Sequence, residues 1–86
     1  MEAGTIKNWH RDKGFGFVKM RDPAMPDAFL HIHEIRNLTD DDIPAVGDVV
    51  LFDLAAPDEG RPSPKAINAL IILGPEQNEL WVATIA

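Results

Sequence analysis

Five short runs of apolar and β-branched residues, separated by turn-forming residues, make up the hydrophobic pattern of this chain. The runs are residues 4–9, 15–20, 28–33, 48–54 and 65–73. Apolar and polar residues alternate loosely in the first run and clearly in the next two, which is typical of strands with one buried face. Helical spacing is weak throughout. The pattern predicts an all-β domain, and because closure removes exposed sheet edges, we expect a small antiparallel barrel of five strands.

Proline, glycine and acidic residues mark the connections between these runs. Pro23 and Pro26 interrupt the chain before the third run, and residues 57–64 have the composition of a loop. The best candidate for a helix is one turn around Thr39 to Pro44, because Thr39 can cap it and the aspartates suit the positive end of a helix.

An apolar tail follows the last run. Gly74-Pro75 separates the two, so we expect one domain over residues 1–73 and a C-terminal extension over residues 74–86. The last seven residues of the extension are candidates for a sixth strand or for a hydrophobic contact. Residues 80–85 are the expected contact with a protein partner or a second copy of the chain.

The composition excludes several classes of protein. A chain of 86 residues that is 45% hydrophobic and 26% charged is typical of one soluble globular domain. The chain has no cysteine, which excludes a disulfide framework, a thiolate nucleophile and a zinc site built on sulfur. No apolar run approaches the roughly 18–20 residues of a membrane span, and residues 1–4 lack a basic and hydrophobic leader. We therefore expect a cytoplasmic protein with no membrane partner.

Charge is segregated along the chain. Residues 1–21 carry five bases against two acids, whereas residues 22–86 carry three bases against twelve acids, within a total net charge of −6. The total alone argues against a nucleic-acid partner, since Lys and Arg supply phosphate affinity, and solubility is sufficient to explain it. However, the basic part also holds three of the six aromatic residues. Cations and rings therefore coincide in residues 1–21.

The second and third runs predict which side chains face solvent. Phe15, Phe17 and Lys19 share one face of the second run, and from this run alone either face can be the buried one. In the third run, aliphatic residues alternate with Phe29, His31 and His33. The aliphatic set is the natural core side, so we expect Phe29 and His31 at the surface. Pairing of the runs then favours exposure of Phe15 and Phe17.

Pairing of the first three runs predicts one aromatic surface patch with cations at its border. The expected rings are Trp9, Phe15, Phe17, Phe29 and His31, and the expected cations are Lys7, Lys13 and Lys19. Exposed rings stack on bases of any sequence, and the cations neutralise phosphates. The patch predicts binding of single-stranded RNA or DNA.

A metal site and an active site find little support. His31, His33 and His10 can supply imidazoles, but Glu34 would point to the opposite strand face, so we expect no bound metal. Ser63 is the only serine and lies between two prolines. We therefore expect no enzyme, no cofactor and no small-molecule substrate.

Several segments resemble one family. K-G-F-G-F-V at 13–18 and A-F-L-H-I-H at 28–33 are similar to the two ribonucleoprotein-type motifs of bacterial cold-shock proteins. The remaining segments have the family's order and spacing, and they are G-T-I-K-N-W-H-R-D at 4–12, V-G-D-V-V-L-F at 46–52 and P-K-A-I-N-A at 64–69. The resemblance covers residues 3–73.

The resemblance implies an OB-fold barrel that binds single-stranded RNA or DNA with little sequence preference. It also implies a passive nucleic-acid chaperone and a role in regulating transcription or translation. The family's binding residues fall on all the residues of the predicted patch except Lys19, and these are Lys7, Trp9, Lys13, Phe15, Phe17, Phe29 and His31.

The chain departs from the family at two stacking positions. Asn8 stands where the family usually has tryptophan, and Ile32 stands where it has phenylalanine. Loss of one stacked base lowers affinity about tenfold or more, because each contributes roughly 1–3 kcal/mol. We therefore expect weak binding. The alternative is an OB-fold protein-interaction module with residual nucleic-acid affinity, which contacts its partner through Leu80, Trp81, Val82 and Ile85.

Overall fold

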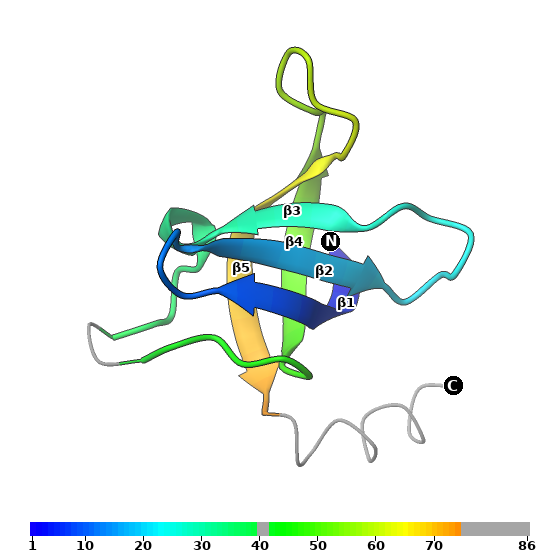
Figure 1. Ribbon diagram of the computed structural model, residues 1–86. Helices are drawn as coiled ribbons and strands as arrows, with labels where there is room; N and C mark the ends of the chain where they lie inside the picture. Colours follow the sequence, from blue (N-terminus) through cyan, green and yellow to red (C-terminus); the bar gives the residue numbers. More distant parts are fainter. Residues whose placement is uncertain (40–41, 75–86) are drawn as a thin grey trace.

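The computed structural model describes residues 1–39 and 42–74, and five strands account for about half of them (Figure 1). The strands are β1 (Glu2–His10), β2 (Phe15–Met20), β3 (Ala28–His31), β4 (Val49–Ala55) and β5 (Lys65–Leu73), with a 3₁₀ turn η1 (Ile32–Glu34) after β3. The bounds of β2 and β5 are those predicted from the sequence. Among the described residues, no helix is long and apolar enough to cross a membrane.

The strands form a closed barrel in the order β1-β2-β3-β5-β4, which confirms the predicted all-β OB-fold. Four of the neighbouring pairs are antiparallel, and β3 and β5 run parallel, with Phe29 opposite Lys65 and Leu30 opposite Ala66. One parallel pair is unavoidable here, because strand direction cannot alternate all the way round a closed ring of five.

The core lies inside the barrel and draws on every strand. Its buried residues are Ile6, Val18, Met20, Ala28, Leu30, Ile35, Val50, Phe52, Ala66 and Ala69. Val18 and Met20 of β2 and Ala28 and Leu30 of β3 are the side chains that alternation placed inside. The predicted inner and outer faces of these two strands are therefore confirmed.

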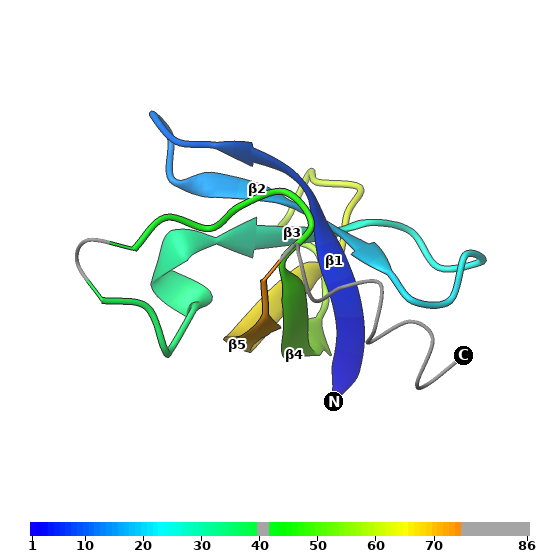
Figure 2. The same ribbon diagram turned by 90° about the horizontal axis from the view of Figure 1, so that it is seen from below.

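A β-bulge at Lys7 reverses the faces in the second half of β1. Figure 2 shows that β1 bends strongly along its length. Ile6 pairs with Val18, but Asn8 pairs with Phe17 and Trp9 with Gly16. Residues paired across two strands share a face, so Asn8 lies on the phenylalanine face and Trp9 lies on the core side, where it packs against the core. The expectation that Trp9 shares a face with Phe15 and Phe17 was wrong, because alternation does not anticipate an inserted residue.

Gly16 makes this arrangement possible. A Cβ at this position would lie 2.7 Å from Cε3 of Trp9 and would clash with the backbone oxygen of Asn8. The absence of a side chain at Gly16 therefore allows the Trp9 ring to lie across β2.

Two expectations about the segment after β3 were also wrong. The strand ends at His31, because η1 begins at Ile32 and Nδ1 of His31 accepts a hydrogen bond of 3.2 Å from the His33 backbone N–H. Thr39 and residues 42–44 are not helical. Instead, Thr39 and Asp42 hydrogen-bond to each other, and the Thr39 N–H and hydroxyl lower the pKa of the Asp42 carboxyl.

Two parts of the predictions fall outside the described residues. They are Asp40–Asp41 of the proposed helical turn and residues 75–86 of the C-terminal extension, including the proposed contact at 80–85.

Candidate nucleic-acid interface

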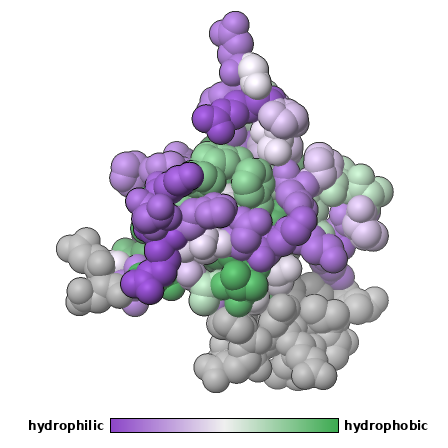
Figure 3. Space-filling view, viewed as in Figure 1, coloured by the Kyte–Doolittle hydropathy of each residue, from purple (hydrophilic) through white to green (hydrophobic). Residues whose placement is uncertain are grey.

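Three phenylalanines form a ring cluster on the outer face of β2 and β3. Phe17 lies opposite Phe29 in the strand register, and their ring centroids are 5.8 Å apart. Phe15 lies 5.3 Å from Phe29. All three rings are half-buried and lie outside the core cluster. Figure 3 shows an apolar area over β2 and β3 with hydrophilic residues around it. The predicted surface position of these rings is confirmed.

Two histidines extend the cluster at either side of Phe15. The His10 ring lies 5.1 Å from the Phe15 ring, and His10 is paired with Phe15 in the register. His31 of β3 also lies opposite Phe15 in the strand register, and its ring lies 4.6 Å from that of His33. His10 was not predicted as a surface ring, because the bulge at Lys7 brings it to this face in place of Trp9.

The three predicted lysines differ in how they relate to the rings. Lys19 is exposed on the same face of β2 as Phe15 and Phe17. Lys13 is exposed in the turn between β1 and β2. Lys7 is exposed at the bulge, but its Nζ lies 2.9 Å from Oδ2 of Asp27 in the β2–β3 loop. Within residues 1–39 and 42–74, Lys7 is therefore the predicted cation with an acidic partner.

The β4–β5 loop and the first residue of β5 bring further charged residues to the rings. The Arg61 guanidinium carbon lies 6.0 Å from the centroid of Phe29, and the Phe29 N–H donates a hydrogen bond of 2.8 Å to the oxygen of Pro64. Nζ of Lys65 lies 2.8 Å from Oδ1 of Asp58. Sequence reasoning missed Arg61 and Lys65, because their place beside Phe29 depends on the parallel β3–β5 pairing.

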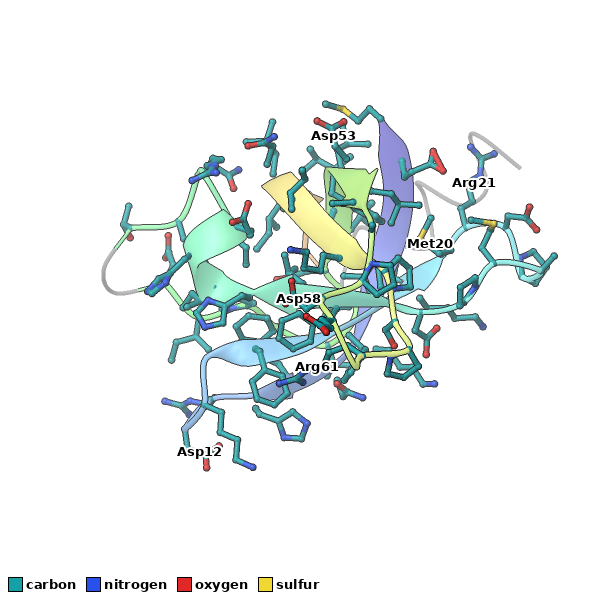
Figure 4. The ribbon with its side chains drawn as sticks, turned by 90° about the horizontal axis from the view of Figure 1, so that it is seen from above. Asp12, Met20, Arg21, Asp53, Asp58 and Arg61 are labelled. Carbon is teal, nitrogen blue, oxygen red and sulfur yellow. The ribbon has the colours of Figure 1, made fainter. Side chains whose placement is uncertain are left out.

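Neutralising Asp27 is expected to strengthen oligonucleotide binding. The Asp27→Asn variant frees Lys7 for a phosphate, and we expect a gain of about two- to fivefold at low salt, the strength of an exposed ion pair. Binding measured over a salt series should then also steepen by about one unit of slope. Asp53→Asn is the matched control, because Asp53 lies away from the ring cluster (Figure 4). An equal gain in both variants would contradict a local role for Lys7.

The histidines do not form a metal site in the described part of the chain. Within residues 1–39 and 42–74, no group of three or more histidine, cysteine, aspartate or glutamate side chains could hold an ion. His31 and His33 instead contact each other. The arrangement of this face is that of flat, partly exposed rings with cations at their edges, which suits stacking of planar groups and contact with anions.

Comparisons with known proteins agree with this geometry. No protein-family model matches the chain. The chain is 34% identical over 73 residues to cold shock protein ScoF of Streptomyces coelicolor, which covers 79% of this chain and 94% of that protein. It is also similar to the solved structure of Drosophila Unr CSD456, with a TM-score of 0.61 and 25% identity over 84% of this chain. The chain spans 26% of that larger structure. The barrel, the motifs of β2 and β3 and this identity show that the chain belongs to the cold-shock domain family.

Proposed function

We propose that this domain binds single-stranded RNA or DNA by stacking unpaired bases on its ring cluster. The observation that carries the proposal is the continuous series of ring contacts from His10 through Phe15 and Phe29 to Phe17, with centroids 5.1 to 5.8 Å apart. Rings that pack against each other are held in place, and the three phenylalanines are only half-buried, so part of each ring stays accessible to a base. Such a surface takes any sequence, because every base has a π-face.

Cations beside the rings supply the second part of the interaction. Lys19 follows Phe17 on the outer face of β2, and Lys13 lies at the turn next to Phe15. Phosphates that flank the stacked bases would reach these lysines. Because the whole chain carries a net charge of −6, we expect stacking to supply most of the affinity and phosphate contacts to supply a salt-dependent part.

The structure supports weaker binding than a fully aromatic face would give. Asn8 lies opposite Phe17 on the ring face, and its side-chain oxygen accepts a hydrogen bond of 3.2 Å from the Phe17 backbone N–H. Asn8 thus stabilises the bulged pairing but offers no ring to a base. His10 adds a smaller ring beside Phe15.

We further propose that the domain is a passive nucleic-acid chaperone, in the cytoplasm and without catalytic activity, with a role in regulating transcription or translation. A protein that binds only the unpaired state lowers the population of hairpins by mass action and needs no cofactor or energy source. A fluorescent RNA or DNA hairpin should melt at lower temperature with saturating protein. With the Phe15→Ala/Phe29→Ala variant, the melting temperature of the hairpin should stay at the value measured without protein. An unaltered melting curve with the natural sequence at saturation would reject the chaperone role.

A further inference from the structure

A pocket of about 200 Å³ lies between the ring cluster and the β4–β5 loop. Phe17 and Phe29 line it on the side of β2 and β3, and Lys65 lines it at the start of β5. The residues that line it on the loop side are Asp58, Arg61, Pro62 and Ser63. Figure 4 shows Asp58 and Arg61 on the loop beside the rings. The pocket therefore combines an aromatic wall with a carboxylate, a guanidinium and an ammonium group.

The two flat groups of the pocket suit a planar ligand. The Arg61 guanidinium carbon is 6.0 Å from the centroid of Phe29. A base between two flat groups needs about 7 Å, twice the van der Waals separation of roughly 3.5 Å. Arg61 is exposed, so its long side chain has room to move outward until the guanidinium is about 7 Å from the Phe29 ring. Phe29 and Arg61 can then stack on opposite faces of one base.

The remaining two charged groups suit the edge of that base. The Asp58 carboxylate accepts hydrogen bonds and the Lys65 ammonium donates them. Oδ1 of Asp58 and Nζ of Lys65 lie 2.8 Å apart. The Watson–Crick edge of guanine has two adjacent donors, N1–H and N2–H, followed by the acceptor O6. Both donors can reach the carboxylate while O6 reaches the ammonium. Adenine, cytosine and uracil each offer only one donor group on this edge.

We propose that this pocket is a guanine subsite, in which Phe29 and Arg61 stack on the base and Asp58 and Lys65 hydrogen-bond to its edge. The proposal rests on the proposed single-strand binding and adds base selectivity at one position. Lys65 is well placed for this role, because it lies directly opposite Phe29 in the parallel pairing of β3 with β5. The rest of the ring face stays tolerant of sequence.

Binding of short oligonucleotides with the full chain tests the proposal. Fluorescence anisotropy should compare oligothymidine of six nucleotides with versions in which one thymidine is replaced by guanosine, position by position. At one position guanosine should bind about tenfold more tightly, because a good bidentate contact separates a base with two adjacent donors from a base with one. Inosine at that position, which lacks the N2 amino group, should lose several-fold.

Two charge-neutralising variants separate base selectivity from general electrostatics. Asp58→Asn should remove the guanosine preference while oligothymidine still binds. Glu59→Gln removes the same charge from the adjacent loop residue, which does not line the pocket, and should keep the preference. Three results would overturn the subsite alone. They are oligothymidine binding without any guanosine preference, a guanosine preference that survives in Asp58→Asn, and equal binding of inosine and guanosine. Absence of binding to every oligonucleotide would overturn the proposed function as well.

Discussion

Replacing Phe15 and Phe29 together by alanine is expected to weaken binding of short single-stranded oligonucleotides about a hundredfold or more. Each stacked base contributes roughly 1–3 kcal/mol, and every 1.4 kcal/mol is a factor of ten. Phe29 is central to the cluster, since its ring contacts those of Phe15 and Phe17 and lies beneath Arg61. Its loss therefore also removes the support for its neighbours.

Fluorescence anisotropy with labelled oligothymidine measures this loss. Met25→Ala is the control, because Met25 is an exposed apolar residue in the β2–β3 loop, 39% exposed, and has no place in the ring cluster. Its binding should match that of the natural sequence. If the double variant bound as tightly as Met25→Ala, stacking on this face would be excluded, and contacts elsewhere would have to carry the affinity.

Replacing Phe52 by alanine is expected to act on folding and not directly on binding, with a large loss of stability. Phe52 is the phenylalanine that β4 points into the barrel, and it is 0% exposed. Phe→Ala in a core typically costs about 3–5 kcal/mol, from lost burial and the cavity left behind. Native domains have only about 5–15 kcal/mol in total, so Phe52→Ala should remove about a fifth of this stability or more.

Urea unfolding followed by circular dichroism measures this effect. Phe52→Leu, which keeps most of the volume, should lose much less than Phe52→Ala. Phe15→Ala/Phe29→Ala should lose less per ring than Phe52→Ala, because the two rings are half-buried and lie outside the core. Equal destabilisation per ring would show that the outer phenylalanines support the barrel as much as Phe52 does, and the binding loss in the double variant would then reflect lost folding. The two phenylalanine predictions thus control each other.

Sequence reasoning succeeded where neighbouring residues in a strand settle the question. In β3 the aliphatic residues Ala28 and Leu30 had to be inside, so Phe29 and His31 had to be outside. Strand pairing then transferred this assignment to Phe15 and Phe17 of β2. Both steps depend on the period-two alternation of side chains, which is a local property of extended backbone.

The same reasoning failed at β1 for a physical reason. One inserted residue at Lys7 shifts the register between Ile6 and Asn8, and every later side chain changes face. Trp9 therefore turned to the core side and His10 to the ring face. The clue was present at Gly16, since a residue without a side chain marks a close approach, but the partner that approaches it follows only from the pairing.

The amino-acid sequence was sufficient to predict the strand-rich architecture and the inner and outer faces of β2 and β3, and it carries the motifs of the cold-shock domain family. These features depend on residues one to a few positions apart, and local sterics and burial act on them directly. The folded barrel was needed to show the faces on which Trp9 and His10 lie, the pairing of Lys7 with Asp27, and the place of Arg61 and Lys65 beside Phe29. Those depend on which strands become neighbours and in what register, and closure of the barrel fixes both.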